Sequence, residues 1–383
     1  MINLSEPFLR SDEIKNVNKC LKTGWLSSSG SFVKKFEKKL KKLTKSKNVI
    51  SCQSGSSALN LCFKILKIQK HTEVLIPTIT FVAPTNSILI NDCYPVFLDV
   101  DQKNCLDVIK FTKFLNEEVQ IKNKKSINKK SKKIISAIII PHVFGNMTVM
   151  DKIINLCKKY NIKVIEDAAE AICVYAKKGR FKNKHAGTIG DIGCLSFNVN
   201  KVVTAGGGGA FLINDKKKAK YARYLINQAK DNSKLFIHNE VGFNLSMNNI
   251  QAAIGCAQLD KINFFLKIKK KNFLNYNVKF KNNKFFEILD PSKNVKSNYW
   301  LNILKTNKNN AFKIFKSLQS KKIESRLLWY PMHLLKPFKK FQKYNIKQAI
   351  KNYKSHLCLP SSINLKSHEI DSIVKTICQN DKK

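Results

Sequence analysis

Residues 193–209 of the chain read GCLSFNVNKVVTAGGGG. The short apolar run Gly193 to Phe197 predicts a strand, and Lys201 follows it, ahead of the glycine run Gly206 to Gly209. A lysine held at a strand end beside the hydroxyl of Ser196 suits a nucleophilic amine that works near a phosphate. Such an amine forms a Schiff base with pyridoxal phosphate (PLP) if a carboxylate elsewhere keeps the ring nitrogen of the cofactor protonated. Taken alone, a lysine in such a place is far more often a solvated loop residue, so the partners of Lys201 must decide.

The candidate carboxylate is Asp167, in the stretch VIEDAAE at residues 164–170. Residues 162–165 predict a strand, which leaves Asp167 at the carboxyl end of that strand. Ligands of open α/β sheets bind at that edge. The alternative is that Asp167 only caps the segment that follows.

Apolar runs alternate with helical patterns through the first 250 residues. The strands predicted there include residues 73–77, 95–99 and 134–140, and they imply a mostly parallel sheet covered on both faces. A further strand, 48–52, meets Ser54-Gly55-Ser56-Ser57 and a helix start, which together form an anion cradle. The same serines also fit a simple helix cap. Residues 116–133, rich in Lys, Asn and Ser, predict an exposed excursion.

Beyond residues 242–244 the alternation stops. We expect one long helix over 249–274, short strands over 285–289 and 299–304, a helix over 311–320 and a final helix after His368. These elements predict two domains: residues 1–250 form a large α/β domain, and residues 251–383 form a smaller α+β domain.

Composition excludes several classes of protein. The formal net charge is +44, but only four of the 70 basic residues are arginines: Arg10, Arg180, Arg223 and Arg326. The lysines are spread over nearly every polar face, which argues against a specific nucleic-acid site. No secretory signal opens the chain, no apolar run is long enough for a bilayer, and the eleven cysteines lack the pairing of a metal site. We therefore expect a cytoplasmic protein with no membrane partner and no metal.

Several blocks of sequence, in this order, closely resemble the DegT/DnrJ/EryC1/StrS family of PLP-dependent sugar aminotransferases. They are Ser54-Gly55-Ser56, Glu166-Asp167-Ala168-Ala169-Glu170, the run from Gly190 to Phe197, and Lys201. The resemblance runs from about Leu4 to Ser362. Within the family, the chain looks most like the nucleotide-sugar 4-aminotransferases of legionaminic-acid-type pathways. The blocks behind that closer match are residues 139–146, the Lys/Asn-rich excursion before them, and residues 227–230, 249–255, 297–302 and 329–333.

The resemblance implies the fold of PLP fold type I, the aspartate aminotransferase architecture, and it implies roles for individual residues. Lys201 would carry the Schiff base and move the proton, Asp167 would pair with the ring nitrogen, and Glu170 would lie near the ring oxygen. Four further residues complete the cofactor contacts: Phe81 would stack on the ring, while Gly55, Ser56 and Ser196 would hold the phosphate. Arg326, Trp329 and His333 would line the sugar side.

The family also implies a homodimer with shared active sites, in which Asn244 reaches the phosphate of the neighbouring subunit. The block around it reads GFNLS at 242–246, where the family has Gly-Tyr-Asn-Tyr-Arg, so contacts there differ. A second departure is Pro141, which stands directly before His142.

The expected reaction moves an amino group from L-glutamate to the C4 keto group of a nucleotide-linked 4-keto-6-deoxy sugar, such as 2-acetamido-2,6-dideoxy-hexos-4-ulose. Four alternatives stay open: a perosamine-type GDP-sugar 4-aminotransferase, a catalytically silent scaffold or regulator, a nucleic-acid-binding protein, and a sugar dehydratase of the same cofactor class. Dehydratase relatives replace the Schiff-base lysine, whereas Lys201 is present.

Overall fold

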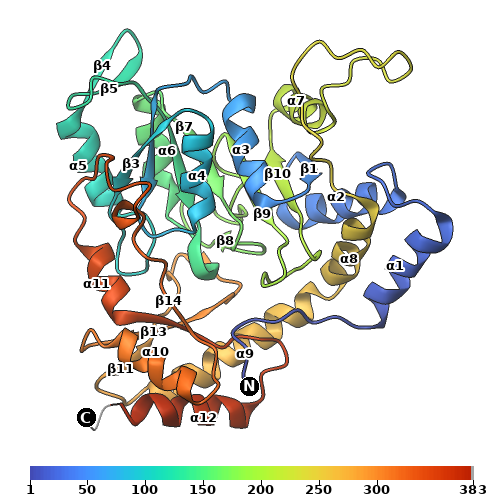
Figure 1. Cartoon of the computed structure of the whole chain (residues 1–383). Helices are drawn as coiled ribbons and strands as arrows, with labels where there is room; N and C mark the ends of the chain where they lie inside the picture. The colour runs from blue at the N-terminus through green and yellow to red at the C-terminus, as the bar shows by residue number, and fades with distance from the viewer. Residues whose placement is uncertain (381–383) are drawn as a thin grey trace.

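A computed structural model describes residues 1–380 and centres on a seven-stranded sheet (Figure 1). Its strand order is β1-β10-β9-β7-β6-β2-β3. Strands β9, β7, β6, β2 and β3 run parallel, and β10 runs antiparallel to both of its neighbours. The expected mostly parallel sheet is therefore confirmed, as is the α/β class. The strands are β1 (Asn48–Cys52), β2 (Glu73–Pro77), β3 (Tyr94–Leu98), β6 (Ile135–Pro141), β7 (Lys163–Asp167), β9 (Ile192–Ser196) and β10 (Gly209–Ile213).

Helices cover both faces of this sheet because the strands alternate their buried side chains between two apolar clusters. On β2, for example, Leu75 joins one cluster, while Val74 and Ile76 join the other. Helices α2, α5 and α6 contribute to the first cluster, and α3, α4 and α7 contribute to the second. Their bounds are α2 (Ser31–Thr44), α3 (Gly55–Ile65), α4 (Val82–Ile90), α5 (Val108–Glu118), α6 (Met150–Lys159) and α7 (Lys216–Ile226).

A smaller antiparallel sheet, β11-β13-β15-β14, lies at the lower end of the molecule in Figure 1, close to both termini. It is flanked by the helices of the carboxyl-terminal third. The elements here are β11 (Phe286–Ile288), β13 (Asn302–Thr306), β14 (Arg326–Leu327), β15 (His356–Leu359), α10 (Ala311–Ser320), α11 (Gln348–Ser355) and α12 (Ser367–Cys378). This is the expected α+β arrangement. The short helix η2 (Met332–Leu334) packs on the large sheet instead, where Met332 joins the second apolar cluster.

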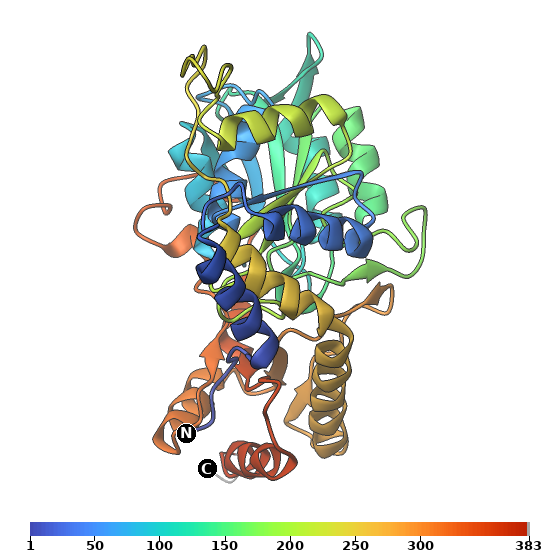
Figure 2. The same ribbon diagram turned by 90° about the vertical axis from the view of Figure 1, so that its right-hand side faces the viewer.

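The expected single helix over 249–274 was wrong. The structure has two helices, α8 (Asn249–Asp260) and α9 (Ile262–Phe280), with a break at Lys261. The Lys261 ammonium lies 2.9 Å from Glu13 Oε2, and Gln258 Nε2 donates to Glu13 Oε1 at 2.8 Å. These contacts fix α8 against the amino-terminal helix α1 (Ser11–Thr23), and the two lie side by side in Figure 2. Past the break, α9 packs on the smaller sheet instead.

The division of the chain at residue 250 stays a prediction. Buried residues of α8, among them Ala252 and Cys256, share an apolar cluster with Phe36 of α2. The last three residues of the predicted second domain, 381–383, lie outside the described part of the chain.

Two excursions leave the body of the molecule. The predicted excursion at 116–133 folds as a hairpin of β4 (Val119–Lys122) and β5 (Lys125–Asn128), which the composition did not indicate. Between α7 and α8, an arm around residues 231–243 projects outward in Figure 1. The remaining short elements are η1 (Val143–Gly145), β8 (Tyr175–Ala176) and β12 (Val295–Lys296). None of the helices in residues 1–380 combines the length and apolar character needed to cross a bilayer.

Candidate active site

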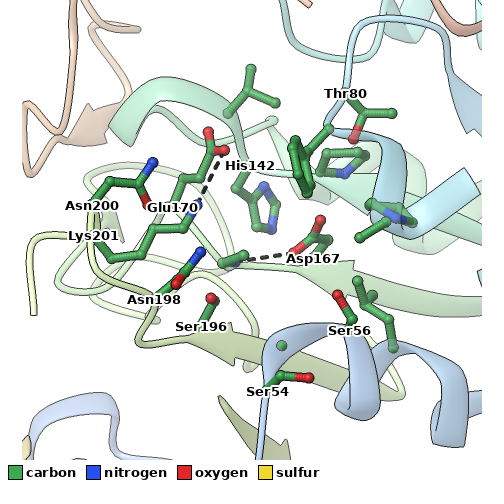
Figure 3. Close-up of a pocket in the computed structure, with 18 of the residues that line it drawn as sticks. Ser54, Ser56, Thr80, His142, Asp167, Glu170, Ser196, Asn198, Asn200 and Lys201 are labelled. Atoms are coloured by element: carbon green, nitrogen blue, oxygen red, sulfur yellow. Dashed lines mark hydrogen bonds and ion pairs between the residues drawn. The ribbon is translucent and has the colours of Figure 1, made fainter. Parts of the chain in front are cut away.

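A cavity of about 240 Å³ opens where β6, β7 and β9 end (Figure 3). The register places Pro141 opposite Asp167, and Asp167 opposite Cys194. Residues that follow these strands therefore meet at one edge, as parallel strands require. The helix starts of α3 and α4 and the smaller sheet close the other sides: Gly55, Phe81 and Arg326 all line the cavity.

The start of α3 forms a small cradle on one side of the cavity. Ser54 caps the helix, and its hydroxyl accepts a hydrogen bond from Ser57 N at 3.0 Å. The backbone N–H groups of Gly55 and Ser56 belong to the first turn, where a helix supplies no internal acceptor. A Cβ on Gly55 would stand 2.9 Å from Ser196 Cβ, so only glycine permits this approach. The N–H groups and the helix dipole thus suit an anion.

Asp167 stands at the cavity wall at the end of β7. Its Oδ1 accepts a hydrogen bond from Ala169 N at 3.1 Å, and the side chain is almost completely buried. Burial raises the pKa of Asp167, while the Ala169 N–H and the Lys201 charge act to lower it. A cationic partner inside the cavity would favour its ionised form.

The neighbouring carboxylate, Glu166, points to the opposite face of the strand and is completely buried. It lies 2.8 Å from His142 Nε2 and also accepts hydrogen bonds from the backbone N–H groups of Gly187, Ile189 and Gly190. Burial acts to raise the pKa of Glu166, but these bonds lower it overall. Because Thr148 N donates to His142 Nδ1, we assign the ring proton to Nε2, which donates to Glu166.

Lys201 enters the cavity from the loop after β9. Its Nζ lies 3.5 Å from Glu170 Oε1 and 4.3 Å from the centre of the Trp300 ring. Phe144 N donates to the other oxygen of Glu170 at 2.9 Å. Burial raises the pKa of Glu170 to about 7, although the Lys201 charge acts against this shift. The amine and this carboxyl group are therefore close enough to exchange a proton.

The rim of the cavity is aromatic and carries one arginine. Phe81 is half exposed, and its ring meets Trp329 edge-on with centroids 6.3 Å apart. Trp329 in turn stacks on Phe144 with centroids 4.6 Å apart. Arg326 projects from β14, and its guanidinium is about half exposed. This combination suits a ligand that has both a ring and a negative charge.

Comparison with a protein-family model matches residues 7–378 to the DegT/DnrJ/EryC1/StrS aminotransferase family. The chain belongs to this family. It is 31% identical to the GDP-perosamine synthase of Escherichia coli, over 98% of this chain and 97% of that protein. It is 28% identical to a UDP-4-amino-4,6-dideoxy-N-acetyl-beta-L-altrosamine transaminase of Campylobacter jejuni, over 96% and 94% of the two chains.

Solved structures of aminotransferases share the fold. The PseC aminotransferase of Helicobacter pylori superposes with a TM-score of 0.89 at 23% identity, covering 100% of this chain and 99% of that one. The aminotransferase TlmJ of Streptoalloteichus hindustanus gives the same TM-score at 21% identity, with the same coverage. These structures have the expected fold. The family and the relatives identify the protein as a PLP-dependent sugar aminotransferase.

The cavity fits PLP. The cradle at Gly55 and Ser56 suits the phosphate, the buried carboxyl of Asp167 suits a ring nitrogen, and Lys201 supplies the amine. Thr80 Oγ1 also borders the cavity and has no hydrogen-bond partner among the described residues, although it is buried. A ligand can provide the missing partner.

Nine of the residues proposed for the site line this one cavity: Gly55, Ser56, Phe81, Asp167, Glu170, Ser196, Lys201, Arg326 and Trp329. Two do not. Asn244 is exposed outside the cavity, where its backbone pairs with Asn227. His333 is buried against Phe97, and its Nδ1 lies 2.7 Å from Thr78 Oγ1. The structure therefore does not bring His333 into contact with the sugar side.

Sequence reasoning assigned no role to His142, Trp300 or Thr80, although all three lie at the site. His142 follows β6 directly, so the neighbouring strand ends could have indicated it. No nearby sequence pattern indicates Trp300. It lies over Lys201 in the fold, although the two residues are 99 positions apart in the sequence.

The raised pKa of Glu170 predicts a pH-dependent stability. Between the ordinary value of 4.5 and about 7, the folded protein binds this proton more tightly than the unfolded chain does. Stability should therefore fall as the pH rises through this interval, by up to about 3 kcal/mol. The Glu170→Gln variant should lack this component. Urea unfolding midpoints of both cofactor-free proteins from pH 5 to pH 8 provide the measurement.

The exposed Glu287 offers a matched control, because Glu287→Gln removes a carboxylate that solvent already screens. Its pH profile should follow that of the wild type. Parallel profiles for the wild type and Glu170→Gln would show that Glu170 does not hold its proton in the folded state.

Proposed function

We propose that the protein transfers an amino group from L-glutamate to the C4 keto group of a nucleotide-linked 4-keto-6-deoxy sugar. The observation that carries this proposal is the convergence of the Lys201 amine, the Asp167 carboxyl and the Gly55 cradle on one cavity. Aromatic side chains and Arg326 lie at the mouth of the cavity. They suit a substrate that consists of a sugar ring and a negatively charged nucleotide diphosphate.

When bound, PLP supplies an aldehyde that takes up the amino group and a ring that delocalises negative charge. Asp167 would stabilise the positive charge of the ring nitrogen, because its buried carboxyl group borders the cavity and a cation there favours its ionised form. The cradle at Gly55 and Ser56, together with the Ser196 hydroxyl, holds the phosphate. This anchor keeps the cofactor in place when Lys201 is displaced from it.

With PLP bound, Lys201 would take the proton from the amino-bearing carbon of glutamate and would later deliver a proton to C4 of the sugar. Its Nζ is free for this task only after the incoming amine has displaced it. Glu170 lies 3.5 Å from this nitrogen and can hold or return a proton at neutral pH, because burial raises its pKa to about 7. With PLP bound, Glu170 would face the ring oxygen. Phe81, at the rim, supplies an aromatic face on which the ring stacks.

Arg326 and Trp329 form the substrate side. The guanidinium suits a carboxylate or a diphosphate through two parallel hydrogen bonds, and the indole suits the face of a sugar. Both substrates of the reaction carry such a negative charge. One pocket can therefore accept glutamate and the nucleotide sugar in turn.

We place the reaction in the assembly of a surface glycan of the legionaminic-acid type, with a 2-acetamido-2,6-dideoxy-hexos-4-ulose as the sugar. Residues 139–146 and 297–302 support this choice by resemblance. A perosamine-type GDP-sugar reaction is the second candidate, since the chain is 31% identical to a GDP-perosamine synthase. A cytoplasmic location fits both, because no cysteine of residues 1–380 forms a disulfide.

A panel of 4-keto nucleotide sugars tests the substrate. Purified enzyme with PLP and L-glutamate should convert UDP-linked 2-acetamido-4-keto sugar to its 4-amine with the highest kcat/KM, and GDP-linked 4-keto sugar at least tenfold less well. Product mass and C4 configuration are read by mass spectrometry and NMR. A reversed preference would establish the perosamine-type reaction. No turnover with any sugar, and no conversion of the bound cofactor by glutamate, would indicate a silent scaffold.

Replacement of the two central residues should separate their roles. Lys201→Ala should abolish turnover, because the site loses both its covalent attachment point and its proton carrier. Asp167→Asn should retain PLP weakly and lose most of its rate. The exposed Lys178→Ala serves as control and should keep the wild-type rate. Steady-state assays measure the turnover rate of each variant, and thermal melting verifies that each variant is folded. Substantial turnover by Lys201→Ala would refute the assignment.

We further propose a homodimer in which Asn244 completes the phosphate site of the neighbouring subunit. Asn244 lies in the connector between α7 and α8, where backbone bonds from Phe243 N to Leu225 O and from Leu245 N to Ile226 O hold it. Its side chain is exposed at a fixed point of the surface, outside the cavity of its own chain. An amide can donate to a phosphate without adding charge.

Subunit mixing tests the shared site. Lys201→Ala and Asn244→Asp homodimers should both be inactive, the second because a carboxylate repels phosphate. In a mixed dimer both lesions fall in one pocket, so the other pocket is intact and activity should return. Mixing Lys201→Ala with a chain that carries both changes is the control and should restore nothing. If activity does not return although subunit exchange is verified, Asn244 acts within its own chain or has no role in the site.

A further inference from the structure

Trp300 lies directly behind the amine of Lys201. The Lys201 Nζ stands 4.3 Å from the centre of the indole ring, and Glu170 Oε1 lies 3.5 Å from the same nitrogen. Trp300 is buried, and the Lys201 side chain is only 13% exposed. The amine is therefore enclosed by an aromatic face and a carboxyl group, with little water to solvate it.

Three hydrogen bonds fix the position of Trp300. Its indole N–H donates to Asn200 O at 2.8 Å, which ties the ring to the residue before Lys201. Its backbone N–H donates to Asn298 Oδ1 at 2.9 Å, and Asn298 Nδ2 donates to Glu170 O at 3.0 Å. The aromatic face and Glu170 are thus held relative to each other through one asparagine.

The third bond comes from Lys269 of α9, whose ammonium is completely buried. Lys269 Nζ donates to Trp300 O at 3.0 Å and to Ser361 O at 2.5 Å. Burial lowers the pKa of Lys269 to about 7. A buried ammonium needs acceptors for its protons, and here the carbonyl of Trp300 is one of them. Loss of this contact would leave one N–H of the Lys269 ammonium without an acceptor. The contact therefore stabilises the backbone position of Trp300.

The face of an aromatic ring attracts a charged ammonium group much more strongly than a neutral amine. The face of Trp300 therefore acts on Lys201 when its amine is free and charged. The other ionisable groups that line the cavity around this amine are the carboxyl groups of Glu170 and Asp167, the guanidinium of Arg326 and the imidazole of His142.

We propose that Trp300 and Glu170 form a holding site for the free amine of Lys201. The site keeps the displaced amine beside the reacting atoms and prevents it from swinging toward solvent. This inference deepens the proposed function and rests on its assignment of Lys201 as the residue that bonds PLP.

Competitive labelling of the cofactor-free enzyme with acetic anhydride tests the holding site. Only a neutral amine reacts, and mass spectrometry resolves Lys201 from the other lysines. Rates are measured from pH 6 to pH 11. The limit at high pH reports how well the reagent reaches the amine, and the rate at pH 7.5 relative to that limit reports the neutral fraction.

Two variants form a matched pair, since Trp300→Phe and Trp300→Leu both lose the indole N–H and part of the volume, but only Trp300→Leu loses the aromatic face. The relative rate at pH 7.5 should rise by about threefold to tenfold in Trp300→Leu and by clearly less in Trp300→Phe. Equal rates in the two variants, or no rise in either, would overturn the proposal.

If Trp300→Leu does not fold, the fluorescence of Trp300 replaces it. In a Trp25→Phe, Trp329→Phe background, Trp300 is the one tryptophan left. Its emission should change over the same pH range in which Lys201 begins to label, and Lys201→Met should abolish that change. A pH response that persists without Lys201 would also overturn the proposal. Neither measurement uses turnover, so failure of the proposed function would be seen separately, in the sugar assays.

Discussion

The buried carboxylate of Glu166 is the contact on which the site depends. It receives His142 from the end of β6 and three backbone N–H groups from the loop before β9. A buried carboxylate without these donors would be costly, so the loops must close around it. Because adjacent strand residues face opposite ways, fixing Glu166 also fixes the direction of Asp167. Three strand ends are thereby locked into one edge, and the cavity forms there.

The second requirement is the antiparallel direction of β10. The chain leaves β9, places Lys201 in the cavity and returns through the glycine run into β10. A Cβ on Gly209 would stand 2.4 Å from Ser54, so the return brings β10 against the start of α3. The amine and the anion cradle are consequently neighbours in space, although they are far apart in the sequence.

Much of this arrangement could be predicted from local patterns. The apolar run at 134–140 gave β6 to within one residue at each end, and the strand before Asp167 fixed its place at the sheet edge. Long-range contacts could not be predicted. The break at Lys261 depends on Glu13, and the position of Trp300 depends on Lys269 and Asn200. The same limit explains His333, whose bond to Thr78 spans 255 residues and turns it away from the cavity.

Lys269 also joins segments that lie far apart in the sequence. Its ammonium must give up water when α9 packs, and the carbonyls that replace this water belong to Trp300 and Ser361, which lie 31 and 92 residues further along the chain. Closing that longer loop has an entropic cost before any contact is gained. The buried position of Lys269 is therefore fully satisfied only when the segment around Ser361 is in place. A chain cut before Ser361 would leave the Lys269 ammonium without one of its two carbonyl acceptors.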